Sequence, residues 1–299
     1  MRWAVRLAAP PLGDAGAPPC AHQGRGYGGA MTTLGSPDFL GVARERVYSP
    51  GKVEDDRAIL DAVADHLRVT HTVTVVSADD PLPAVEPPTV VFAMCQGPAA
   101  LATMRGWEAR GVRIVNAVAG VENAHRRRML AAFARHRVPH PESVVIDADP
   151  HAALPDWVDA GAWVKRGDVH ATDPDDVVRV ADRAAARAAL AAFARRGIAA
   201  ACLQRHVAGA VIKFYAVRDG AFFRWFGDVA LPPATGAAMQ QLAEVGARAL
   251  ELEVFGGDVV CDGNGGLSLI DLNDWPSYGR CRFDAAEAIA SYVRKTRTS

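Results

Sequence analysis

The chain has 299 residues, of which 50% are hydrophobic and 22% are charged, and its 33 basic and 34 acidic side chains leave a net charge of −1. This balance provides no basic field for nucleic acid or an anionic membrane, and no apolar run reaches the roughly 18 residues of a membrane-spanning helix. The five cysteines are odd in number and form no CxxC pair, so we expect reduced thiols in a cytoplasmic protein.

Residues 1–37 differ in composition from the rest of the chain. They contain two Pro-Pro pairs and many glycines without hydrophobic periodicity, which is typical of a disordered extension. A signal peptide is the alternative, because Arg2 and Arg6 precede a short apolar stretch, but Pro10 interrupts that stretch early. Met31 is an alternative start codon, in which case the leader is an annotation artefact.

Between residues 38 and 117, helical and strand patterns alternate. Ile59, Val63 and Leu67 recur on one face of a helix, and residues 99–110 predict a second helix. The expected strands are the short apolar or β-branched runs at 73–76, 89–94 and 112–115. Strands that alternate with helices are typical of a parallel sheet, so we expect an N-terminal α/β domain over residues 38–117.

The remaining residues predict a central lobe over 118–205 and a C-terminal lobe over 206–299. In the central lobe, one helix is expected at 121–135, two helices at 175–196 and a strand at 200–204. In the C-terminal lobe, we expect two hairpins, 211–217 with 222–226 and 254–260 with 267–272, and helices at 237–250 and 284–295.

Three oxygen-bearing side chains in the last hairpin predict a metal site. The tight turn brings Asp258 opposite Asp271 and Asn273, and these two lie two positions apart on one strand, so they share a face. Two carboxylates and an amide oxygen suit Mg²⁺, which fills its other positions with water and substrate phosphates. The alternative is a solvent-facing hairpin with acidic ends, although the apolar neighbours of Asp271 argue against it.

Two lysines are candidates for phosphate contacts. Lys165 closes a short apolar segment before a glycine turn, although an exposed lysine after a strand is the commoner arrangement. Lys213 interrupts a hydrophobic run, where either a buried anionic partner or a polar strand face accounts for it. No GxxxxGK[ST] motif occurs, so the site is not a P-loop.

In this order and spacing, these elements resemble the ATP-grasp superfamily over roughly residues 39–297. The chain looks most like the glutathione-synthetase and ribosomal-protein glutamate-ligase group, and it has features similar to the inositol trisphosphate 5/6-kinases. The resemblance implies an α/β fold of three lobes, with ATP bound between the central and C-terminal lobes.

The resemblance also implies roles for particular residues. Asp258, Asp271 and Asn273 would bind two Mg²⁺ ions, with Mn²⁺ as an alternative. Arg126, where many such ligases have lysine, and Lys165 would contact the ATP phosphates.

Further roles fall on the loop and strands that follow. The segment from Gly167 to His170 would close over ATP, Lys213 would contact phosphate or substrate, and Arg224 would stabilise the transition state. The resemblance assigns adenine recognition to the hinge residues Gln204, Arg205, His206 and Val207.

The function that this resemblance implies is a carboxylate–amine ligase that acts through an acyl phosphate on a small-molecule or peptide carboxylate. A small-molecule kinase that phosphorylates a hydroxyl is the second candidate, and a non-catalytic nucleotide-binding module is the third.

Two departures from the family pattern leave the substrate open: no acidic ribose-binding residue follows the hinge, and the segment between Phe226 and Ala237 is short. The loop from Ser49 to Lys52 is expected to face the acceptor. The oligomeric state is open, although homodimers are common among such enzymes.

Overall fold

The computed structural model describes residues 36–167 and 173–297, which form three four-stranded sheets with helices packed on them. Within these two ranges, no helix is both long and apolar enough to cross a membrane.

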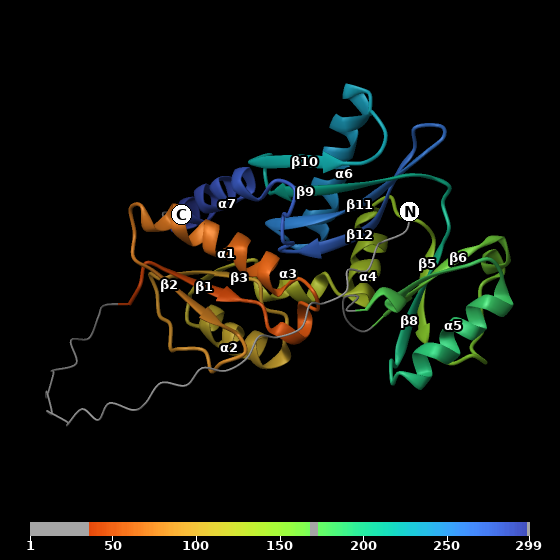
Figure 1. The fold of residues 1–299 in the computed structure, drawn as a ribbon, viewed down its shortest axis with the longest axis horizontal. Helices are drawn as coiled ribbons and strands as arrows, with labels where there is room; N and C mark the ends of the chain where they lie inside the picture. The colour runs from red at the N-terminus through yellow and green to blue at the C-terminus, as the bar shows by residue number, and fades with distance from the viewer. Residues whose placement is uncertain (1–35, 168–172, 298–299) are drawn as a thin grey trace, which may run out of the picture. The chain divides into compact units, whose positions relative to one another are not determined.

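The first sheet is parallel and has the strand order β2-β1-β3-β4. Its strands are β1 (Phe39–Ala43), β2 (Val73–Ser77), β3 (Val90–Ala93) and β4 (Arg113–Val115). Helices α1 (Val53–Arg68) and α2 (Pro98–Ala109) lie on opposite faces of it (Figure 1), which confirms the predicted parallel α/β arrangement. The interior strand β1 is buried at every position, so it lacks the alternation that marks a strand in sequence. A short 3₁₀ helix (Arg46–Tyr48) follows β1.

The second sheet is antiparallel and has the order β5-β8-β6-β7. It consists of β5 (Ser143–Asp147), β6 (Ala162–Arg166), β7 (Val177–Val180) and β8 (Ala200–Arg205), with short 3₁₀ helices at Asp156–Ala160 and Pro174–Asp176. The expectation of two helices over residues 175–196 is wrong. Only α5 (Arg183–Arg195) forms there, because Asp182 caps its first turn through Ala185 N–H and the preceding β-branched residues pair with β6.

The third sheet has the order β10-β9-β11-β12 and is also antiparallel. Its strands are β9 (Gly209–Val217), β10 (Phe222–Phe226), β11 (Val254–Asp262) and β12 (Leu267–Asp274). The register confirms both predicted hairpins. Helix α6 (Pro233–Leu250) buries Met239, Leu242 and Ala243 against one face of this sheet, which leaves the other face for polar side chains.

A break divides the helix expected at residues 121–135. The structure has α3 (Val118–Asn123) and α4 (Arg126–His136) instead, because His125 between them has extended backbone angles. Helix α4 packs Met129 and Phe133 into the core of the third sheet. This packing places Arg126, the first residue of α4, next to Asp271 of the predicted metal site.

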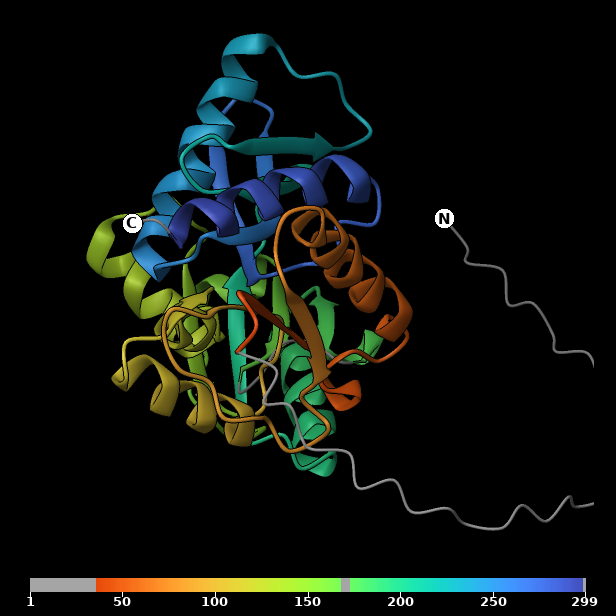
Figure 2. The same ribbon diagram turned by 90° about the vertical axis from the view of Figure 1, so that its left-hand side faces the viewer.

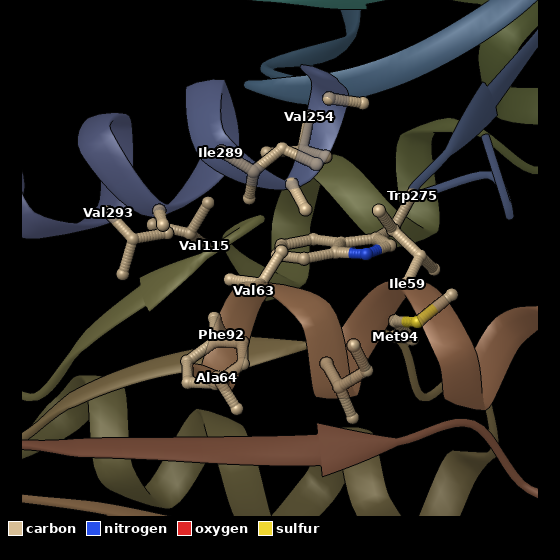
Figure 3. Packing of buried hydrophobic residues seen from close by; sticks show 14 of the residues in the cluster. Ile59, Val63, Ala64, Phe92, Met94, Val115, Val254, Trp275, Ile289 and Val293 are labelled. Atoms are coloured by element: carbon tan, nitrogen blue, oxygen red, sulfur yellow. The ribbon is translucent and has the colours of Figure 1, made fainter. Parts of the chain in front are cut away.

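One hydrophobic core joins the first and third sheets. Helix α7 (Arg282–Thr296) lies beside α1, as Figures 1 and 2 both show. Trp275, just after β12, is buried between them and stacks on Phe92 with ring centroids 6.4 Å apart. Figure 3 shows its indole ring among side chains that include Val63 and Ile289. This packing holds the end of β12 against the carboxyl ends of β1 and β3.

Candidate active site

The acidic residues of the last hairpin lie directly opposite each other. Asp258 on β11 pairs in register with Asp271 on β12, and Gly256 pairs with Asn273. Directly opposed residues of antiparallel strands share a face, so both carboxylates and the Asn273 amide are on the face that α6 does not cover. This confirms the predicted geometry, while metal binding by the three residues stays a prediction. No group of three His, Cys, Asp or Glu side chains with metal-site geometry occurs among the described residues, and this donor set contains only two carboxylates.

Close strand approach and a β-bulge shape this part of the hairpin. A Cβ at position 257 would lie only 2.3 Å from the carbonyl oxygen of Asp271, so Gly257 allows the strands to meet. The register then shifts between Asp258 and Val259, which leaves Ile270 without a ladder partner. The Ile270 carbonyl instead accepts a hydrogen bond of 3.1 Å from Nζ of Lys165, which belongs to the second sheet.

Lys213 on β9 lies beside Asp258 and Asp271, so three charged residues form a row across neighbouring strands. It pairs in register with Asp258, and its Nζ lies 2.8 Å from Asp258 Oδ1. Burial opposes the charged form of Lys213, but the Asp258 carboxylate outweighs it, so the pKa of Lys213 is raised. The ammonium group is therefore held in its charged form beside the predicted metal ligands.

Two further cations converge on Asp271 from other elements. Lys165 is only 5% exposed, and burial lowers its pKa, an effect that Asp271 opposes and Arg126 reinforces. Arg126 is 4% exposed, and its Nη2 lies 3.3 Å from Asp271 Oδ2. Its Nε is buried without a hydrogen-bond partner among the described residues. A buried, incompletely paired set of cations is suited to an anionic ligand.

A cleft of about 350 Å³ lies between the second and third sheets. It brings together most of the residues assigned to ATP: Lys165, Gln204, Arg205, His206, Val207, Lys213, Asp258 and Asp271. Most of the other lining residues have apolar side chains: Pro141, Trp163, Val177, Val211, Val260 and Ile270. The cleft thus combines an apolar slot with a charged end, as a nucleotide requires.

A second cleft, of about 500 Å³, lies between the first sheet and the end of β12. Its lining includes Asn273, Lys213, and the Ser49, Pro50 and Lys52 of the loop that was expected to face the acceptor. Lys213 lines both clefts. The charged row of the third sheet therefore stands where the two clefts meet.

The hinge side chains have defined partners. Gln204 is buried, and Arg205 pairs with Glu142 at 3.5 Å. Trp163 Nε1 donates to His206 Nδ1 at 3.3 Å, and burial together with the nearby Arg179 lowers the pKa of His206. The imidazole is therefore neutral near pH 7 and forms part of the slot.

Arg126, Arg224 and Gly167, which were all predicted as site residues, line neither cleft. Arg224 lines a separate hollow with Asp284, and its guanidinium lies over the ring of Phe222 at 5.3 Å. Gly167 is buried where its N–H donates to Ala200, outside the cleft lining. The prediction for His170 lies outside the described residues.

Three polar residues that line the second cleft, Arg44, Asp56 and Gln96, were not predicted from the sequence. Arg44 follows β1, Gln96 follows β3, and Asp56 belongs to the first turn of α1. Polar residues just beyond the carboxyl ends of parallel strands are a signal for a binding site, and that signal was present for Arg44 and Gln96. Because β1 was not predicted as a strand, Arg44 could not be recognised as a residue at the carboxyl end of one.

The residues present fit a magnesium-bound nucleotide. The donor set of Asp258, Asp271 and Asn273 supplies hard oxygen ligands on one face. The ammonium of Lys165, which forms no ion pair within 4.0 Å among the described residues, offers a buried positive charge for phosphate. The apolar slot beside it is suited to a base.

No protein-family model matches the sequence, and no curated protein matches it either. Solved structures do match. D-cycloserine synthetase DcsG aligns with a TM-score of 0.62 at 19% identity, over 85% of this chain and 99% of that protein. D-alanine–D-alanine ligase from Bacillus anthracis complexed with ATP aligns with a TM-score of 0.66 at 10% identity, over 88% and 99%. ATP-grasp ligase PsnB complexed with minimal precursor, Mg and ADP gives 0.61 at 13% identity, over 88% and 99%. These likenesses, together with the three sheets described above, show that this chain has the ATP-grasp fold.

Proposed function

We propose that this chain is an ATP- and magnesium-dependent ligase that joins a carboxylate to an amine through an acyl phosphate. The observation that carries the proposal is the position of Lys213, which lines both clefts and is paired with Asp258. A cation at that junction would be shared by the phosphate end of a nucleotide and a carboxylate in the second cleft. In this proposal ATP supplies the phosphoryl group that activates the carboxylate, and magnesium neutralises the phosphate charge.

The chain's own residues would act by positioning and by charge. Asp258, Asp271 and Asn273 would hold the metal, and the cationic Lys165 and Lys213 would stabilise charge that develops on phosphoryl oxygens. A charged group that is already oriented needs no reorganisation during the reaction, which is why such groups accelerate acyl transfer. No covalent nucleophile is required on the protein.

The structural neighbours support this reading of the two clefts. The Bacillus anthracis ligase was solved complexed with ATP, and PsnB with Mg, ADP and a minimal precursor. Another PsnB structure contains a precursor peptide and AMPPNP. By analogy, the first cleft would take ATP and the second a small-molecule or peptide carboxylate.

The charge of the second cleft favours a ligase over a kinase of the inositol-phosphate type. Among the described residues, its lining has three cations, Arg44, Lys52 and Lys213, and three anions, Asp56, Asp173 and Asp274. A polyphosphorylated acceptor would require an excess of positive charge, which the described lining of this cleft does not have.

The test is ADP release with Mg-ATP and pooled amino acids, peptides and polyols, with and without hydroxylamine. A hydroxamate that depends on hydroxylamine is expected, because hydroxylamine traps an acyl phosphate. A stable phosphorylated alcohol without hydroxamate would instead establish a kinase. Nucleotide binding without any turnover across the pool would support the non-catalytic module.

A further inference from the structure

We infer that the second cleft binds an α-amino acid whose ammonium and carboxylate groups are both free, held by Asp56 and Arg44. This inference rests on the proposed function, in which that cleft takes the acceptor. It goes beyond that function by naming the chemical class of the substrate and the two side chains that recognise it.

Asp56 presents one carboxylate oxygen that the protein leaves unbonded. The residue is 5% exposed and lines the cleft. Its Oδ2 accepts from Arg44 Nη1 at 3.1 Å and from Ser49 Oγ at 2.6 Å. Its Oδ1 accepts no hydrogen bond from the described residues, and because Asp56 lines the cleft, this oxygen is open to a donor there. An ammonium group in the cleft is a donor of the right charge.

Arg44 supplies the complementary donors beside that oxygen. Its Nε donates to the Met94 carbonyl at 2.9 Å and its Nη2 to the Trp275 carbonyl at 2.8 Å, in addition to the bond to Asp56. A guanidinium has five N–H donors, so two stay available after these three bonds. The bonds also hold the group rigidly at the cleft wall, and a rigid guanidinium is suited to a carboxylate.

Together the pair matches both ends of an amino-acid head group. A free acceptor oxygen and free N–H donors lie on adjacent side chains that are themselves ion-paired. The equal numbers of cations and anions among the described lining residues agree with a ligand that carries one charge of each sign. A volume of about 500 Å³ is in the range for small-molecule sites. A peptide bound through an internal side chain would not use the remaining oxygen of Asp56 or the remaining N–H donors of Arg44.

The test is calorimetric binding to the full chain with Mg²⁺ and a non-hydrolysable ATP analogue. A panel of L- and D-α-amino acids is compared with the same compounds N-acetylated or converted to α-carboxamides. We expect at least one free amino acid to bind about tenfold or more tightly than both blocked forms, since each blocked form loses one of the two charge-assisted contacts with the protein. Equal affinity for the free and blocked forms, tighter binding of blocked peptides, or no binding by any free amino acid would overturn the inference.

The variant Asp56→Asn identifies the residue responsible. It should weaken binding of the free amino acid to that of the N-acetylated form, because the group facing the ammonium loses its charge. Asp61→Asn is the matched control, since Asp61 lies on the same helix but pairs with Arg57 outside the cleft. Retained discrimination in Asp56→Asn would overturn the assignment. The comparison of free and blocked ligands on the unaltered protein tests the ligand class even where the variant fails to fold.

Binding and turnover separate this inference from the proposed function. Because the ATP analogue cannot react, selective binding is measured whether or not the chain is a ligase. Selective amino-acid binding without hydroxamate formation from ATP would overturn the ligase and keep the inference. Hydroxamate formation from N-blocked carboxylates alone would keep the ligase and overturn the inference.

Discussion

Nζ of Lys213 lies 2.8 Å from Oδ1 of Asp258, across neighbouring strands of the third sheet. The pair joins a predicted metal ligand to the residue that lines both clefts. In the proposed reaction, Lys213 would stabilise charge that develops as the phosphoryl group moves between the two sites. It would add little to binding of the adenine end of ATP, which would lie toward the hinge in this proposal.

Lys213→Met should therefore lower kcat by about 100-fold or more, while KM for ATP changes little. The matched variant Lys213→Arg keeps a positive charge and should retain more activity than Lys213→Met. Steady-state kinetics with ATP as the varied substrate measures both parameters. A rise in KM at constant kcat would show that Lys213 contributes only uniform binding, contrary to this prediction.

Asp271→Asn should bring turnover to background while the protein still binds nucleotide. The substitution keeps the size of the side chain but removes one of the two carboxylates on the shared face. Magnesium affinity should fall, because the neutral amide is a weaker ligand for a hard cation. Calorimetry with ADP in the presence and absence of Mg²⁺ separates the two effects. Undiminished activity in Asp271→Asn would disprove the metal assignment.

The hairpin that carries these residues was predictable because its signals are local. The Asp-Gly-Asn-Gly turn and the flanking apolar runs specify two paired strands, and strand pairing then dictates that Asp258 faces Asp271. By contrast, β7 is short and directly precedes an alanine-rich helix. Its residues Val177, Val178 and Val180 were therefore predicted as part of a helix and not as a strand.

The second cleft depends on contacts between distant segments. Gln96 Nε2 donates to Asp274 Oδ1 at 2.9 Å, although 178 positions separate them in the chain. Arg44 likewise bonds the carbonyl of Trp275. No spacing rule in one sequence connects such residues, so the acceptor side could be expected only from a resemblance. The same holds for the burial of Arg126, which depends on how α4 packs under the third sheet.

Arg126→Met should weaken the metal site more than it weakens nucleotide binding. Arg126 is buried, contacts Asp271 and lines neither cleft, so its position supports the carboxylate rather than the phosphates. Loss of a side chain that orients a metal ligand costs about 10–100-fold in metal affinity. Mn²⁺ titration followed by electron paramagnetic resonance measures that loss, and Arg126→Lys should show a smaller one. Weaker binding of metal-free ADP with an unchanged Mn²⁺ affinity would instead place Arg126 on the phosphates.

Lys165→Met should stabilise the free protein while it weakens ATP binding. Lys165 is buried, and burial lowers its pKa below the ordinary value of 10.5, so the charged ammonium costs stability in the folded state. Removal of this charge should raise the free energy of unfolding at pH 7 by on the order of 1 kcal/mol. The same charge would attract the phosphates, so the affinity for ATP should fall.

The pH dependence of that gain follows from the direction of the pKa shift. Below the folded-state pKa, Lys165 is charged in both states and its full cost is present. Between the folded-state pKa and 10.5, only the unfolded chain keeps the proton, so the stability of the unaltered protein rises with pH. The advantage of Lys165→Met should therefore shrink as the pH approaches 10.5. Urea unfolding of both proteins at pH 7 and at higher pH measures this difference. Arg294→Met, on the exposed face of α7, is a control whose free energy of unfolding should stay within about 0.5 kcal/mol of the unaltered protein. If Lys165→Met unfolds more easily than the unaltered protein at pH 7, the buried ammonium stabilises the protein without ATP. The prediction that its burial costs stability would then be wrong.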